Sequence, residues 1–120
     1  RVDRRQRQMC IRDRYSDEKL DEITRNFDLD EIELKFNQIL VNILGAEEEN
    51  CQIIWVSSKI LTSNYKVYCE LKYRENVYRD DLKVEECLNE IGAIMKSYFK
   101  VKLRLRSFGI NQLSIKALDL

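Results

Sequence analysis

The chain has 120 residues, of which 21 are basic and 21 acidic, and it contains no histidine and no proline. That length is typical of one domain. The absence of histidine excludes His-based acid–base catalysis, Ser–His and Cys–His nucleophilic pairs and most zinc sites. No apolar run approaches the roughly 18 residues of a membrane-spanning helix, and we expect a protein of the bacterial cytoplasm without a membrane partner.

Arginine dominates the first fourteen residues. Residues 4–13, RRQRQMCIRD, resemble the translation of a sequencing adapter at the edge of a metagenomic contig, and such segments are set aside before the fold is considered. We therefore predict that residues 1–14 are a non-native, disordered leader and that residues 15–120 form a single α+β domain. The alternative is a basic arm for nucleic acid. The leader holds six Arg and two Asp, so the rest of the chain has 15 basic and 19 acidic residues.

Two helices are predicted after the leader. Ser16 can cap a short helix over residues 16–26. Asp28 and Glu31 have the spacing of a capping box, and apolar side chains then recur at helical intervals as far as Leu44, where Gly45 supplies a left-handed C-cap. The carboxylates of these helices fall on the solvent side, so we expect no catalytic acid among them.

Strand patterns follow. Residues 51–57 are β-branched and aromatic, residues 59–62 can form a short second strand, and residues 65–73 alternate between apolar and polar side chains. An alternating strand of this kind has one face in the core and one face in water.

The last third of the chain predicts a helix over residues 81–98, an alternating strand over residues 100–107 and a final strand over residues 112–118. Gly92 lies inside this helix at a cost of about 1 kcal/mol relative to Ala, which we interpret as a sign of close packing against another element. The order of elements favours an α+β two-layer sandwich, in which a mixed or antiparallel sheet of four to five strands carries helices on one face.

Cys51, Cys69 and Cys87 are too few and too widely spaced for a disulfide framework, and none forms a C-x-x-C pair. We expect reduced, partly buried thiols. The acidic residues match neither an EF-hand loop nor a phosphate-binding glycine loop. We therefore expect no catalytic residue, no metal and no cofactor.

The polar side of the alternating strands carries the candidate binding residues. Bases mixed with aromatics are typical of single-stranded nucleic-acid platforms, but charged alternation also protects exposed strands from aggregation. The six candidates are Lys66, Tyr68, Lys72, Lys102, Arg104 and Arg106.

These observations lead to the hypothesis of a non-enzymatic protein that binds another macromolecule. A phage or mobile-element origin, with a role as a host-factor inhibitor or an assembly subunit, fits the small size. The alternative is a single-stranded nucleic-acid-binding protein that uses the basic sheet face. A third hypothesis is self-assembly, in which residues 112–118 add as a strand to a sheet edge.

Overall fold

The computed structural model describes residues 8–14, 24–58 and 64–120. Its sheet has the strand order β2-β1-β3-β4. Strand β1 (Gln8–Arg14) runs parallel to β2 (Gln52–Ser58) and antiparallel to β3 (Val67–Arg74), and β3 runs parallel to β4 (Leu103–Ile110). Helices α2 (Leu29–Leu44) and α3 (Asp81–Tyr98) connect the parallel pairs. Each half of the chain is therefore a β–α–β unit.

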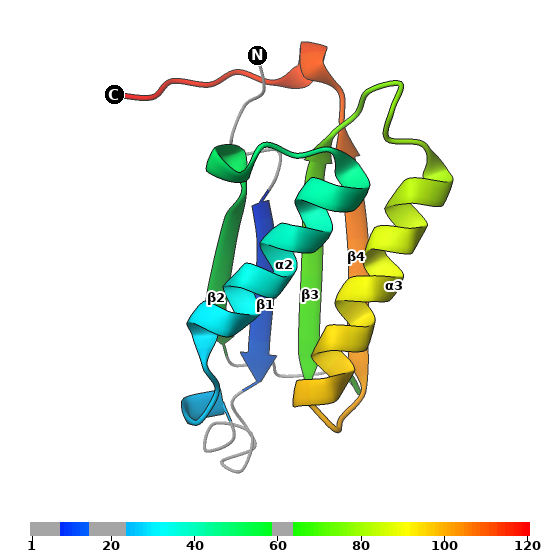
Figure 1. Cartoon of the computed structure of the whole chain (residues 1–120). Helices are drawn as coiled ribbons and strands as arrows, with labels where there is room; N and C mark the ends of the chain where they lie inside the picture. Colours follow the sequence, from blue (N-terminus) through cyan, green and yellow to red (C-terminus); the bar gives the residue numbers. More distant parts are fainter. Residues whose placement is uncertain (1–7, 15–23, 59–63) are drawn as a thin grey trace.

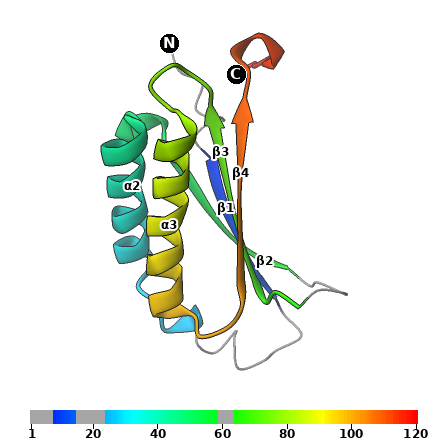
Figure 2. The same ribbon diagram turned by 90° about the vertical axis from the view of Figure 1, so that its right-hand side faces the viewer.

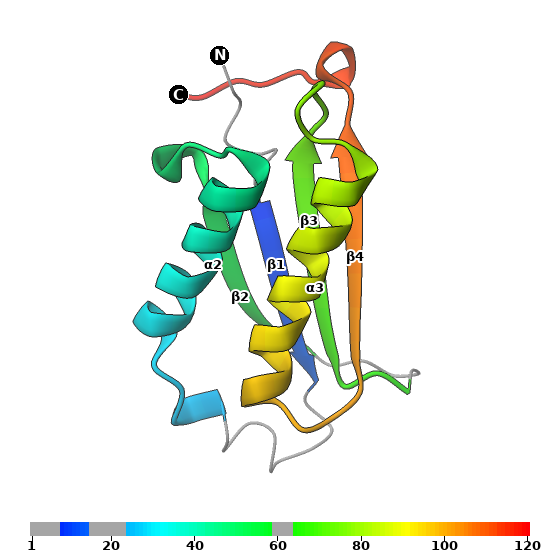
Figure 3. The ribbon, with the colours of Figure 1, turned by 45° about the vertical axis from the view of Figure 1, so that its right-hand side comes forward.

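Both helices lie side by side on one face of the sheet (Figures 1 and 3). Seen edge-on, the opposite face of the sheet carries no described helix (Figure 2). The predicted α+β domain, in which helices pack on a sheet, is thus confirmed. We call the face of the sheet opposite α2 and α3 the open face.

Local signals in the sequence explain where α2 begins and ends. The Asp28 carboxylate accepts hydrogen bonds from the backbone N–H groups of Asp30 and Glu31, at 3.1 and 3.2 Å, which satisfies two donors at the start of the helix. Gly45 ends the helix with φ 65°, a conformation that favours glycine. This helix was predicted correctly.

The core lies between the helices and the sheet. Phe36 of α2, Ile91 of α3 and Leu71 of β3 are almost completely buried there. Phe27, just before α2, packs edge-on against Trp55 of β2 and Phe99 after α3, with ring centroids 6.3 and 5.1 Å apart. The prediction that Trp55 belongs to the core is consistent with these contacts.

A buried arginine ties α2 to the loop before α3. Arg79 is 6% exposed, and its Nε and Nη1 atoms donate to the carbonyl oxygens of Leu44 and Arg74, at 2.9 and 2.8 Å. The Leu44 carbonyl is one of those that the end of a helix leaves without a helical partner, and a cation is favourable at this negative end of the helix dipole. The side chain therefore caps α2 from outside the helix.

The strands differ from the prediction in three places. Residues 8–14 form β1, between β2 and β3, so this part of the expected leader is not outside the domain; its non-native origin stays a prediction. Residues 112–118 form no strand: they begin with the 3-10 turn Gln112–Ser114 and continue without regular structure. The predicted strand at residues 59–62, and most of the predicted helix at residues 16–26, lie outside the described residues.

The role inferred for Gly92 is also corrected. A Cβ atom at this position would lie 3.7 Å from the nearest Leu105 side-chain atom, an ordinary van der Waals distance. Close packing therefore does not require a glycine there.

Candidate functional site

Alternation along β3 divides its side chains between the core and the open face. Val67, Cys69 and Leu71 are buried under the helices, so Tyr68 and Glu70 point to the opposite side of the sheet. In the β3–β4 ladder Tyr68 pairs with Arg104, and Glu70 pairs with Arg106. Because paired residues of neighbouring strands share a face, the two arginines also belong to the open face.

The structure brings the six predicted site residues onto this one face. Lys72 follows Glu70 by two positions on β3, and the backbone N–H of Lys66 donates to the Lys102 carbonyl at 3.2 Å, which extends the same ladder. We call this group, together with Glu70, the charged cluster. Its members are Lys66, Tyr68, Glu70, Lys72, Lys102, Arg104 and Arg106.

Glu70 is the member that sequence reasoning missed. Its Oε2 atom accepts a hydrogen bond of 2.7 Å from the Tyr68 hydroxyl, and its Oε1 atom lies 3.4 Å from Lys72 Nζ. The Glu70 side chain is only 16% exposed, against 43% for Lys72. Alternation alone places residue 70 between residues 68 and 72 on the polar side, and this was the signal that could have identified it.

The arginines are placed to meet an anion. The Arg104 guanidinium lies 4.3 Å from the centroid of the Tyr65 ring, a cation–π contact that holds its long side chain. Arg106 is exposed and stands opposite Glu70 in the ladder. A planar guanidinium can bind a carboxylate through two parallel hydrogen bonds. The charged cluster therefore combines anion-binding groups with one partly shielded carboxylate, which can accept a proton.

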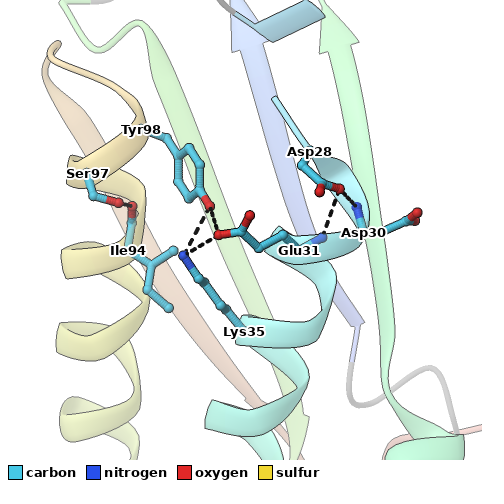
Figure 4. A network of polar contacts seen from close by, with 7 residues as sticks. All are labelled: Asp28, Asp30, Glu31, Lys35, Ile94, Ser97 and Tyr98. Carbon is cyan, nitrogen blue, oxygen red and sulfur yellow. Dashed lines mark hydrogen bonds and ion pairs between the residues drawn. The ribbon is translucent and has the colours of Figure 1, made fainter. Parts of the chain in front are cut away.

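A second polar network joins α2 to α3 and has a different character. Lys35 Nζ lies 2.9 Å from Glu31 Oε1 and donates to the Tyr98 hydroxyl at 3.2 Å, and that hydroxyl donates to Glu31 at 3.3 Å (Figure 4). The hydrogen bonds to Glu31 and Tyr98 raise the pKa of Lys35 above its ordinary value, so this lysine stays a cation and not a neutral nucleophile. We interpret the network as a link between the helices.

Neither metal nor membrane binding receives structural support. Within residues 8–14, 24–58 and 64–120, no three His, Cys, Asp or Glu side chains form a group that could hold a metal ion. None of the helices described is long and apolar enough to cross a bilayer.

No protein-family model matches the sequence, and neither does any curated protein. Solved structures do match. A member of the cis-3-chloroacrylic acid dehalogenase family superposes with a TM-score of 0.64 at 10% identity, over 92% of this chain and 79% of its own. A fused 4-OT, solved as an asymmetric trimer, gives 0.63 at 12% identity, over 92% and 91%. The FG41 malonate semialdehyde decarboxylase, inhibited by 3-bromopropiolate, gives 0.55 at 11% identity, over 86% and 82%.

The chain has the tautomerase fold. This finding overturns the prediction of a non-enzymatic macromolecule-binding protein, and with it the nucleic-acid alternative, because tautomerase-fold neighbours include a dehalogenase-family member and a decarboxylase. The error has a physical reason. The absence of histidine removes one acid–base group, but carboxylates, phenols and arginines can move protons and stabilise charge without it.

Proposed function

We propose that this chain is an enzyme that transfers a proton on short oxo or unsaturated carboxylic acids, with the charged cluster as its active site. The observation that carries the proposal is the position of Glu70 between Tyr68 and Lys72, opposite Arg106, on a fold whose neighbours include enzymes. The small molecules in the neighbours' names, chloroacrylic acid, malonate semialdehyde and bromopropiolate, are all three-carbon acids.

Each residue of the cluster has a distinct task in this reaction. Arg104 holds the substrate carboxylate. The Glu70 carboxylate removes a proton from the carbon next to the substrate carbonyl, the electron pair of that C–H bond forms an enolate, and Arg106 stabilises the charge on the enolate oxygen. Return of the proton to carbon regenerates the keto form. Tyr68 and Lys72 are positioning residues, because their contacts fix the Glu70 carboxylate.

Exchange of substrate protons for deuterium tests the proposal directly. Pyruvate and malonate semialdehyde are incubated with the protein in D₂O, and loss of the C–H signal is followed by proton NMR. We expect saturable acceleration over buffer. Glu70→Gln should lower kcat by about 100-fold or more, and Arg104→Ala should raise KM by about 10-fold.

Lys83→Ala is the matched control for loss of a cation. Lys83 lies on α3 over the Tyr78 ring, away from the sheet face, so this variant should keep the native exchange rate. A protein that accelerates exchange of neither acid, or a Glu70→Gln variant as active as the native chain, contradicts the proposal.

We also propose that copies of the chain assemble with one another. On β2, Ile53 and Trp55 pack against the core, so Ile54 and Val56 point to the open face and add apolar surface beside the charged cluster. Assembly would exclude water from Glu70 and Arg106, which strengthens their electrostatic effect on a bound acid. The trimer of the fused 4-OT supports this proposal by analogy of fold.

A further inference from the structure

The segment after β4 has the sequence of a strand but no strand partner. Leu113, Ile115 and Ala117 alternate with polar residues, yet residues 115–120 have no regular structure. Leu113 and Leu118 are 88% and 78% exposed. This segment leads away from β4 across the end of the sheet (Figure 1). A pattern suited to a half-buried strand is thus left in solvent.

The outer edge of β4 offers the missing partner. β4 ends the strand order on its side of the sheet, and an edge strand presents backbone N–H and C=O groups that can pair with another chain. Beside this edge runs an open groove between α3 and β4. Its floor is apolar, with Leu88, Leu103 and Leu105 as the larger side chains, and Glu85 and Lys96 line it at different turns of α3.

Spacing and charge both fit a tail strand at this edge. Side chains two residues apart share one face of a strand, so Leu113, Ile115 and Ala117 can all enter the groove. Asp119 shares that face. Lys96 lies near the end of α3, close to where β4 begins, so a strand antiparallel to β4 brings Asp119 to the Lys96 end of the groove.

We propose that residues 113–119 of one copy add as an antiparallel strand to the outer edge of β4 in a second copy. The proposal rests on the self-assembly proposed above and specifies its contact. The contact is head-to-tail, because the tail of one copy meets the edge of the next, and such contacts close into rings when the rotation between copies permits. The strand would also add a wall beside Arg104 and Arg106 of the receiving copy.

Sedimentation equilibrium of the full chain tests the contact. We expect the native chain to form a defined oligomer and Leu113→Asp to raise its dissociation constant by about 100-fold or more, because a charge would enter an apolar groove. Leu120→Asp is the matched control: residue 120 lies on the other side of the tail strand, so its oligomer should dissociate as the native one does. Leu113 is largely exposed, so circular dichroism of the variant should match the native chain.

A charge exchange tests the direction of the strand. Asp119→Lys and Lys96→Asp should each weaken the oligomer, and the double variant should restore it. A native chain that stays monomeric overturns both the assembly and the tail contact. An oligomer that Leu113→Asp leaves intact, or a double variant weaker than either single one, overturns the tail contact alone.

Discussion

Cys87 shows how burial sets the chemistry of a single residue. It lies on α3 with no exposed surface. Burial, with smaller effects from Glu90 and Glu86, raises the pKa of its thiol to about 12 from an ordinary value of 9.0. Since the thiolate is the reactive form, this cysteine should be inert in the folded chain.

We predict that Cys87 resists alkylation by iodoacetamide at pH 8 while Cys51, which is only partly buried, reacts. Peptide-resolved mass spectrometry of the native protein measures both, and urea-unfolded protein is the control in which both should react. Between pH 9 and pH 12 the folded chain retains a proton that the unfolded chain has lost, so the free energy of unfolding should fall as pH rises through this window. Equal labelling of the two cysteines in native protein would contradict the assignment.

The Arg79 side chain gives a second prediction at this scale. Arg79→Ala leaves the carbonyls of Leu44 and Arg74 without their donor, and we expect a loss of about 3 kcal/mol in the free energy of unfolding. Urea denaturation measures the change. Arg25→Ala removes an exposed arginine and should alter stability by less than about 0.5 kcal/mol; comparable losses in the two variants would refute the capping role.

Among helices and strands, local patterns predicted what local interactions determine. The capping carboxylate of Asp28, the helical repeat of α2 and the left-handed Gly45 are all read within a few residues, and they fix this helix with little help from the rest of the chain. The polar side of β3 was likewise predicted from alternation. Glu70 was missed as a site residue because its significance comes from Arg106, a partner on another strand.

Two other errors come from pairing between distant segments. Residues 112–118 alternate as a strand does, but no neighbouring strand is available to them in this fold. Gly109 was read as a turn residue and lies inside β4, where a Cβ atom would come within 2.8 Å of the Tyr73 hydroxyl. A pattern in one segment indicates that it can form a strand, but the partner strand decides whether it does.

The interior of α3 supplies a prediction at the scale of the element. Gly92→Ala should raise the free energy of unfolding by about 0.5–1 kcal/mol, because alanine is the better helix former and its Cβ meets Leu105 at an ordinary distance. Gly45→Ala is the opposite case, since residue 45 has φ 65° and its Cβ would lie 3.2 Å from the Tyr78 ring. Thermal unfolding of both variants should show Tm shifts of opposite sign. A destabilised Gly92→Ala variant would mean that the glycine is needed where it stands.

For the whole molecule, the decisive segment is the one that the sequence suggested setting aside. β1 pairs with β2 on one side and with β3 on the other, and in the described sheet β2 has no other neighbour. We predict that a chain lacking residues 1–14 loses cooperative unfolding in urea. The matched control lacks only residues 1–7 and retains β1. A chain without residues 1–14 that unfolds as sharply as the full one would show that β1 is dispensable and would support a foreign origin for the segment.

The two β–α–β units meet along one seam, where β1 lies against β3 and α2 against α3. Each unit carries its own parallel strand pair and its own covering helix. A break in the polypeptide between β2 and β3 would therefore leave two fragments of the same plan. Such fragments, mixed in solution, would have a ready-made surface through which to recombine, and the matching halves of two intact molecules could trade places in the same way.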